Sequence, residues 1–475
     1  MSRRRVLLGT VLGVLFALGW WAGGSHASRG LYSGLDLFVE VLETVKANYV
    51  DAVQSDKLVT GAMRGVARGL DPWSRYLDPE EFRAVRGTIQ GAFDGIGASV
   101  DQRGGWPVVI APIEGSPAWD AGLLPGDIIT KIDGRSTFGL TPDEVSGKLR
   151  GAAGTKLAIT VAREAAAHGT TDADVSEKLI ELTRRRVTVK NVPYAFVAAP
   201  GVGYLRLAHF SAHAGSDVAA AIDSLRAAGA RALVLDLRGN PGGTIDESVA
   251  IASQFLPDGA RITSTAGRAN GANRNYDAKA ARSELAWPLA VLVDGGSASA
   301  SEILAGALQD HDRAVLVGDT TYGKGVAQQI YPLRTSLGAL QLTVSRYLTP
   351  SGRSLQRERL LAVVDDGEDG EDDESGTTAR DSVPAAGRVF RTDGGRIVRA
   401  GMGLAPDVHV AADSTAARLR VAAHHPGGAA GAAREALARD PVYQRALEVL
   451  KRSADARGVF AAAGLKVPSS GGARR

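Results

Sequence analysis

Residues 232–243 read Ala-Leu-Val-Leu-Asp-Leu-Arg-Gly-Asn-Pro-Gly-Gly, a short apolar run that ends in a glycine-rich loop. Two later stretches repeat this arrangement. The run 289–293 precedes the serine-rich loop 295–302, and the run 314–317 precedes the glycine-rich loop 318–325. Short continuous apolar runs are typical of buried parallel strands. Amphipathic periodicity predicts helices between them, at 217–228, 244–255 and 299–308. We therefore expect an α/β domain with a mostly parallel sheet and right-handed crossovers.

The three loops are the first candidates for a functional site. In a parallel sheet, the loops at the carboxyl ends of the strands converge on the ligand crevice. Glycine in such loops lets backbone N–H groups approach a substrate closely. We therefore expect the loops 238–243, 295–302 and 318–325 to face one another.

Ser299 and Lys324 are the candidate catalytic pair in these loops. Burial can lower a lysine pKa enough to leave a neutral amine, which can then act as a base for a serine. The amine would take the Ser299 proton and return it to the leaving amine. Gln328 would hydrogen-bond Lys324 and orient it. Backbone N–H groups of Ala300 and of Gly242 or Gly243 would stabilise the oxyanion.

The same residues also fit other functions. Ser299 and Glu302 also fit a capping box. The segment 318–324 is close to a phosphate loop, but Gly325 replaces the Ser/Thr that would hold Mg²⁺, and 326–331 alternates like a strand. His209 and His311 are alternative bases, although no Gly-x-Ser-x-Gly elbow accompanies them. None of the eight histidines lies in a metal-binding pattern, so no metal or cofactor is expected.

Composition narrows the class of protein. A chain of 475 residues suggests about three domains. Because the chain contains 0 cysteines, it excludes a disulfide scaffold, a cysteine nucleophile, a zinc ribbon and an iron–sulfur centre. A net charge of +3 is far from the basic excess of a dedicated nucleic-acid binder.

Residues 1–27 resemble a targeting segment. Three arginines (3–5) precede the uncharged apolar run 6–22, and Ser25-His26-Ala27 offers small residues for cleavage. The segment is expected to act as a signal peptide or, if it is retained, as a membrane anchor. Either outcome exports the rest of the chain.

The remaining sequence changes character several times. Helical periodicity fills 28–88, and short β-rich runs fill 89–165. The α/β region spans 180–360. An insertion at 361–395 contains eight acidic residues within the ten-residue run 365–374 and is expected to be disordered. The last part, 396–475, completes the core and includes an Ala/Arg-rich helix at 432–457 and a tail.

The loops closely resemble those of the carboxyl-terminal processing peptidases, the S41 family of serine endopeptidases with a Ser–Lys dyad. The matching segments are 235–243, 296–303, 322–328, 348–354 and 406–408. The resemblance implies that Ser299 is the nucleophile, Lys324 the base and Gln328 its partner. It also implies an exported enzyme of the bacterial cell envelope; homo-oligomer formation is left open.

A second resemblance places a PDZ domain between the helices and the core. The segments 95–98 and 123–129 match that domain, which binds C-terminal peptides as an added strand. The carboxylate nest would be Gly95, Ile96, Gly97 and Ala98, beside a helix at 141–149. Protein or peptide C-termini are the implied partners. The alternative to an endopeptidase is a PDZ adaptor with an inactive peptidase domain.

Overall fold

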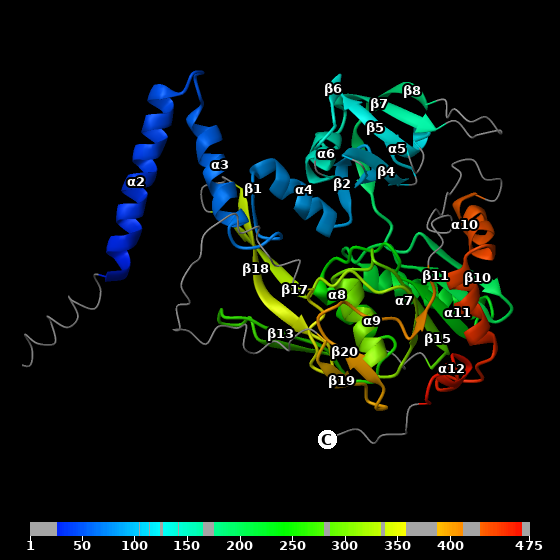
Figure 1. The fold of residues 1–475 in the computed structure, drawn as a ribbon. Helices are drawn as coiled ribbons and strands as arrows, with labels where there is room; N and C mark the ends of the chain where they lie inside the picture. The colour runs from blue at the N-terminus through cyan, green and yellow to red at the C-terminus, as the bar shows by residue number, and fades with distance from the viewer. Residues whose placement is uncertain are drawn as a thin grey trace, which may run out of the picture. The chain divides into compact units, whose positions relative to one another are not determined.

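The computed structural model describes ten ranges of the chain: 26–103, 105–113, 115–123, 127–140, 142–164, 175–279, 286–333, 338–357, 387–411 and 428–467. The chain divides into two units, Met1–Leu70 and Asp71–Arg475 (Figure 1). Of the predicted targeting segment only 26–27 is described, and the acidic run 365–374 lies outside the described residues. Within the described part, no helix is long and apolar enough to cross a membrane.

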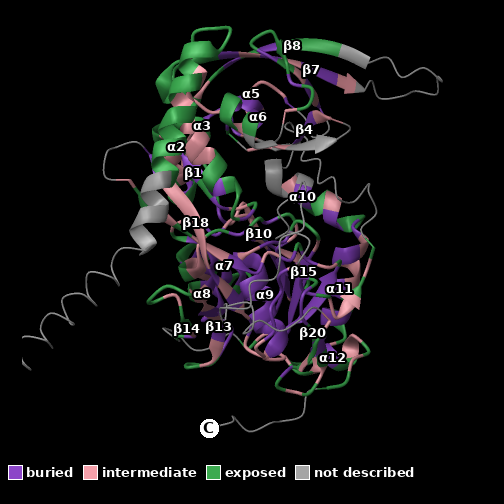
Figure 2. Ribbon diagram, turned by 60° about the vertical axis from the view of Figure 1, so that its left-hand side comes forward, coloured by how far each residue is buried: buried purple, intermediate pink, exposed green. Residues whose placement is uncertain are grey.

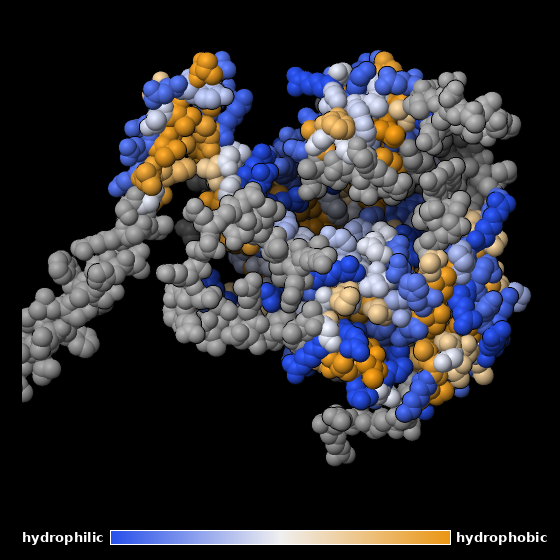
Figure 3. Space-filling view, in the orientation of Figure 1, coloured by the Kyte–Doolittle hydropathy of each residue, from blue (hydrophilic) through white to orange (hydrophobic). Residues whose placement is uncertain are grey.

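The described part of the first unit, 26–70, contains two helices, α2 (His26–Asn48) and α3 (Ser55–Arg68). Both fall in the region where helical periodicity was expected. Apolar side chains gather on the surface of this unit (Figure 3). The largest exposed ones on α2 are Leu35, Leu37, Phe38, Val39 and Val41.

An antiparallel β-sheet domain occupies the first half of the second unit. Its strands are β3 (Ala98–Arg103), β4 (Trp106–Pro112), β5 (Ile128–Ile132), β6 (Arg135–Ser136), β7 (Lys156–Glu164) and β8 (Val175–Thr183). Helices α5 (Pro117–Asp120) and α6 (Pro142–Leu149) pack with it around Ile129, Val145 and Ile159. Strand β8 pairs with β7 along its whole length, so this domain extends past the predicted boundary at 165.

A two-stranded ribbon closes the base of this domain. Strand β2 (Ala92–Gly95) pairs antiparallel with β9 (Arg185–Thr188), in the register Ala92↔Thr188 to Gly95↔Arg185. The chain therefore enters and leaves the domain at neighbouring points. Helix α4 (Pro79–Ile89) precedes the ribbon, and its N-cap Asp78 forms a capping box with Glu81.

A six-stranded sheet forms the centre of the core, in the order β10-β11-β12-β15-β16-β21. Its strands are β10 (Tyr194–Ala199), β11 (Val202–Arg206), β12 (Ala232–Asp236), β15 (Leu289–Val293), β16 (Val315–Gly318) and β21 (Val408–His409). All neighbours are parallel except β10 and β11. The apolar runs of the sequence coincide with the central strands, whose residues are buried on both faces because helices cover each of them (Figure 2).

Different helices cover the two faces. One face packs against α7 (Ala214–Ala227), α8 (Ile245–Ala252) and α9 (Ala300–Asp310), all eleven residues of α9 being buried. The other packs against α10 (Gly428–Ala438), α11 (Pro441–Lys451) and α12 (Gly458–Ala462). The region 432–457, expected to be helical, contains most of α10 and all of α11. Asp440 caps a new helix at this point, and Pro441 occupies its first turn.

A second, antiparallel sheet lies beside the parallel one and was not anticipated. Strand β18 (Ala339–Leu348) pairs with β1 (Arg75–Leu77), β13 (Arg261–Ala266) and β17 (Val326–Pro332), and β13 also pairs with β14 (Arg274–Asp277). The segment 71–78 thereby leaves the predicted helical region and joins the core. This sheet places β17, which follows Lys324, next to β18.

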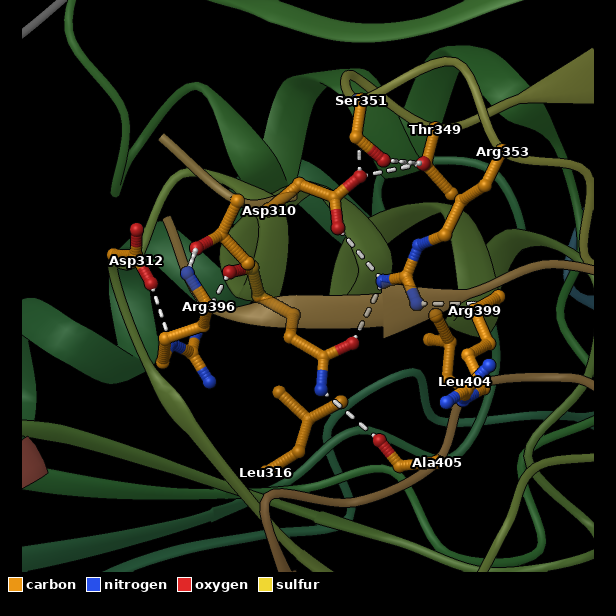
Figure 4. A network of polar contacts seen from close by, with 12 residues as sticks. Asp310, Asp312, Leu316, Thr349, Ser351, Arg353, Arg396, Arg399, Leu404 and Ala405 are labelled. Carbon is orange, nitrogen blue, oxygen red and sulfur yellow. Dashed lines mark hydrogen bonds and ion pairs between the residues drawn. The ribbon is translucent and has the colours of Figure 1, made fainter. Parts of the chain in front are cut away.

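A buried ionic network anchors the turn after β18 (Figure 4). Arg353 donates to Asp310 and Gln309 at the end of α9, both at 2.7 Å, and Asp310 also accepts the N–H of Ser351 at 3.0 Å. Arg396, between β19 (Val389–Arg391) and β20 (Ile397–Arg399), binds Asp312 at 2.6 Å. These contacts fix the segment 349–356 against the helix that begins at Ser299.

Candidate active site

The serine loop and the glycine loop before it are interlocked by hydrogen bonds. The carbonyl of Asn240 accepts from Ala298 N–H at 3.0 Å and from Ser301 Oγ at 2.9 Å. Ser297 Oγ donates to the carbonyl of Leu237 at 2.9 Å. The loops at the ends of β12 and β15 therefore form one rigid surface, as expected for adjacent parallel strands.

Ser299 lies at the N-terminus of α9 in a strained backbone conformation, with φ 57° and ψ −114°. A non-glycine residue in such a region costs about 1–3 kcal/mol and is maintained only where the surroundings impose it. Its side chain is half-buried, so the hydroxyl is accessible at the end of a buried helix. Positive charge at a helix N-terminus favours an anion there.

Glu302 joins the nucleophile loop to the lysine loop. Its Oε2 accepts the N–H of Ser299 at 3.0 Å and that of Lys324 at 2.9 Å. Its Oε1 accepts from Gly323 N–H at 2.8 Å and from the Thr321 hydroxyl. The side chain is fully buried, and burial raises its pKa to about 7 although these four hydrogen bonds favour the carboxylate. A single oxygen thus holds the backbones of both candidate catalytic residues.

The surroundings of Lys324 favour the neutral amine. Burial lowers the pKa of its ammonium and the positive charge of Arg75 lowers it further, while Glu302 and Asp71 oppose these effects. The Nζ atom lies 6.0 Å from the centroid of the Trp73 ring. A depressed lysine pKa is what a base for a serine nucleophile requires.

Gln328 connects to a different partner from the one expected. Its amide donates to Thr343 Oγ1 at 3.3 Å, and Thr343 Oγ1 donates to Asp71 Oδ1 at 3.1 Å. Asp71 also accepts the N–H groups of Trp73 and Ser74, both at 2.8 Å. The predicted bond from Gln328 to Lys324 remains a prediction, and Thr343 links Gln328 to the Asp71 turn instead.

The two glycines proposed for the oxyanion site have different roles. Gly242 donates its N–H to Asn240 Oδ1 at 2.9 Å, so this group is already used. A Cβ at Gly242 would lie 2.8 Å from Ala300 N and 2.7 Å from Ala298 O. Within the described ranges, the N–H groups of Gly243 and Ala300 donate to no other group. Gly243 and Ala300 are therefore the better donor pair, and Gly242 leaves the space beside them open.

A buried charged cluster holds the start of this loop. Arg238 binds Asp236 with Nε at 3.0 Å and Nη2 at 2.7 Å. Although burial acts to raise the pKa of Asp236, Arg238 and Arg206 lower it to about 2. Arg238 Nη1 also lies 2.6 Å from Oδ2 of Asp440, the N-cap of α11. The oxyanion loop is thereby tied to the C-terminal helices.

The two alternative histidine bases are poorly suited to the role. His311 uses both ring nitrogens, on Asp393 Oδ2 at 2.7 Å and on the carbonyl of Arg261 at 2.6 Å. Burial and the positive charge of Arg206 lower the pKa of His209 to about 4, which makes it a weak base. Lys324 remains the favoured base.

The predicted peptide site lies at the edge of the β-sheet domain. Ile96, Gly97 and Ala98 line a cavity together with Phe93 of β2 and with Ser146, Leu149 and Arg150 at the end of α6. Gly97 has φ 75°, and a Cβ there would lie 2.3 Å from that of Ser116. Gly95 does not line the cavity and instead bridges Arg150. The cavity therefore lies between β3 and α6, and the peptide-binding role of residues 95–98 stays a prediction.

Sequence reasoning missed three contributors to this site. Trp73 reaches Lys324 only because β1 pairs with β18, a contact between distant segments. The spacing of Glu302 predicts a capping box but not its bonds to the lysine loop, and no role was predicted for Asp440. The turn-forming Asp71-Pro72 and the helix-starting Asp440-Pro441 pairs were the available sequence signals.

Comparison with known proteins identifies the class. Residues 201–365 match the family model described as peptidase family S41, and residues 108–163 match that of a PDZ domain. The chain is thus a serine-type peptidase with a PDZ domain.

Individual relatives place it more closely. The carboxy-terminal-processing protease of Bartonella bacilliformis is 39% identical over 337 residues, which cover 70% of this chain and 75% of that protein. Carboxy-terminal processing protease CtpA of Bacillus subtilis is 34% identical over 343 residues, which cover 72% of this chain and 71% of that protein. The solved structure of a photosystem II D1 C-terminal processing protease is 27% identical in sequence and has a TM-score of 0.48. The match covers 81% of this chain and 96% of that chain. The chain belongs to the carboxy-terminal processing proteases.

Proposed function

We propose that the protein is an exported serine endopeptidase that recognises protein C-termini through its PDZ domain and cuts peptide bonds with a Ser299–Lys324 dyad. The observation that carries this proposal is the shared Glu302 oxygen, at 3.0 Å from Ser299 N and 2.9 Å from Lys324 N. Two residues from separate loops are held by one atom, which favours a joint role. The peptidase-family membership weighs against the inactive-adaptor alternative.

The chemistry follows from the groups present. Neutral Lys324 removes the Ser299 proton while Oγ attacks the scissile carbonyl, and the carbonyl electrons move to its oxygen. The N–H groups of Gly243 and Ala300 stabilise this oxyanion. The ammonium of Lys324 then protonates the leaving amine, and an acyl-enzyme remains on Ser299. Water hydrolyses that ester with Lys324 again as the base.

Recognition of C-termini rests on the cavity between β3 and α6. Ile96 and Leu149 contribute apolar side chains to its lining, and a nest of backbone N–H groups at residues 96–98 would bind the carboxylate. A substrate with an apolar terminal side chain and a free carboxylate fits these features. The arginines and the apolar run of residues 1–27 support export to the bacterial cell envelope, as a released or membrane-anchored enzyme.

Digestion of β-casein tests the dyad. We expect the wild-type protein to cleave it, and Ser299→Ala and Lys324→Arg to be inactive while remaining folded, because an arginine stays protonated and cannot accept the proton. Ser216→Ala, at an exposed serine of α7, is the matched control. Equal cleavage by Ser299→Ala would rule out this nucleophile.

Peptide binding tests the recognition step separately. Calorimetry with the inactive Ser299→Ala protein should detect a peptide with an apolar C-terminal residue and lose most of the signal when its C-terminus is amidated. Equal affinity for both peptides would exclude carboxylate recognition.

A further inference from the structure

Tyr347 carries a buried hydroxyl group for which the described residues provide no hydrogen-bond partner. Its side chain in β18 is 1% exposed, and its ring packs in the main core cluster with Ala300 and Ile303 of α9. Among the described residues its Oη atom has no hydrogen-bond partner. Buried donors without a partner are rare in native proteins, and each calls for an explanation.

The position of Tyr347 connects it to both halves of the dyad. Its backbone N–H donates to the carbonyl of Gly325, the residue after Lys324, at 3.0 Å. Burial raises the pKa of its phenol well above 10, the Glu302 carboxylate raises this pKa further, and the Ser299 hydroxyl lowers it. The phenol therefore stays protonated and can donate a hydrogen bond. The backbone contact with Gly325 and the place of the ring in the core cluster that includes Ala300 put Tyr347 next to both candidate catalytic loops.

We propose that Tyr347 is a positioning residue for the nucleophile and that its hydroxyl donates a hydrogen bond to Ser299 Oγ. This inference rests on the proposed function and adds one side chain, that of Tyr347 in β18, to the Ser299–Lys324 dyad. Ser299 Oγ can accept this hydrogen bond while its own hydrogen points toward Lys324 Nζ, because a serine hydroxyl has one donor and two lone pairs. Tyr347 then accepts no proton and gives none away.

The arrangement leaves one lone pair of Ser299 free for reaction. The Oγ–H bond breaks as its proton moves to Nζ, and the free lone pair forms the Oγ–carbon bond while the carbonyl π electrons move onto oxygen. The other lone pair keeps the hydrogen bond from Tyr347. The phenol thus restricts the rotation of Oγ and stabilises the negative charge that develops on it, an effect confined to the chemical step.

Tyr347→Phe in the full chain tests the inference because it removes only the hydroxyl. We expect kcat on a β-casein-derived peptide to fall at least tenfold with KM within twofold of wild type. The Tm should change little, because a single hydrogen bond contributes only about 1 kcal/mol to stability. A purely structural role would lower Tm and leave kcat unchanged.

Tyr443→Phe is a closely matched control. Tyr443 in α11 is 3% exposed, its hydroxyl also has no partner in the described part of the chain, and burial likewise raises its pKa. It lies in the opposite core cluster and faces Tyr204 with ring centroids 5.9 Å apart. Its variant should retain wild-type kcat.

Two results would overturn the inference. One is a kcat within twofold of wild type for Tyr347→Phe while Ser299→Ala is inactive, which would leave the proposed function intact. The other is an equal fall in kcat for Tyr347→Phe and for Tyr443→Phe, which would make the effect one of the core in general. If Ser299→Ala were as active as wild type, the proposed function itself would fail, and Tyr347 would lose its role with it.

Discussion

The ring centroid of Trp73 lies 6.0 Å from the Nζ atom of Lys324, so a residue from the turn before β1 covers the candidate base. The contact depends on pairing between β1 and β18, in the register Arg75↔Gln341 to Leu77↔Ala339. The turn before β1 is fixed by Asp71, which accepts Trp73 N–H and Ser74 N–H. The segment 71–77 is therefore part of the active site's wall.

The pH dependence of activity should follow the ionisation of Lys324. Because burial and Arg75 lower its pKa, kcat/KM should rise with pH as the ammonium loses its proton, and the rise should begin below the range of an ordinary lysine. Arg75→Gln removes one of these effects, so the rise should move to higher pH. A kcat/KM profile of both proteins measures the shift.

Salt and a second arginine provide the controls for this shift. Arg75 is exposed, so high salt should reduce the difference between wild type and Arg75→Gln. Arg83→Gln, on the exposed surface of α4, should leave the profile unchanged. Identical profiles for wild type and Arg75→Gln at low salt would contradict the assigned charge effect.

Glu302→Gln should disable the enzyme without changing side-chain volume. An amide offers one accepting oxygen in place of two, so at least one pair of the N–H and O–H groups now bound is left unpaired. We expect kcat to fall at least tenfold, and the free energy of unfolding to fall by about 1–3 kcal/mol for each unsatisfied group. Urea denaturation and peptide kinetics measure the two effects.

Glu302 should also make stability depend on pH. Its pKa is raised from 4.5 to about 7 on folding, so between these values the folded state holds a proton that the unfolded state has released. The free energy of unfolding should therefore decrease as pH rises through this window. Glu302→Gln lacks this contribution, and denaturation of both proteins at several pH values should show their difference narrowing as pH rises. A difference that does not change with pH would contradict the raised pKa.

Asp440→Asn tests the link between the C-terminal helices and the oxyanion loop. Asparagine caps α11 as well as aspartate does, so only the ion pair with Arg238 is lost. We expect kcat to fall, and the free energy of unfolding to fall by about 1–3 kcal/mol. The loss is not larger because Arg238 retains its ion pair with Asp236. Asp440→Ala should lose about 1 kcal/mol more through the missing cap. Unchanged kcat in both variants would mean that the loop does not need this tie.

Gly242→Ala should abolish activity by filling the oxyanion site. The added Cβ would lie 2.7 Å from Ala298 O and 2.8 Å from Ala300 N, and the backbone there has φ 96°. Loss of an oxyanion donor typically lowers kcat by about 10²–10³. Gly259→Ala is the control: it has φ 77° but open space, so it should cost about 1–2 kcal/mol of stability and leave kcat unchanged.

Local patterns in the sequence predicted the elements that are decided locally. The apolar runs ending at Leu237, Val293 and Val317 coincide with parallel strands because both faces of such strands are buried. The family resemblance and the presence of a PDZ domain are confirmed by the comparisons. Ser299 and Lys324 were singled out because their loops have unusual composition.

What escaped prediction depends on contacts between distant segments. The β1–β18–β13 sheet has partly polar strands whose pairing no local pattern specifies. The choice between Gly242 and Gly243 depends on where Asn240 points its amide oxygen. Glu302 has the spacing of a capping box, and nothing in that spacing says that Thr321, Gly323 and Lys324 also bind it.

Because β2 and β9 pair with each other, the PDZ domain is inserted into the chain between two adjacent strands. Since Gly95 lies opposite Arg185, the two chain ends at this point can be joined by a short turn without moving the strands that carry them. Recombination at the ribbon could therefore exchange one recognition module for another of unrelated sequence. Diversification of substrate choice in such a chain needs no change in the loops that perform the chemistry.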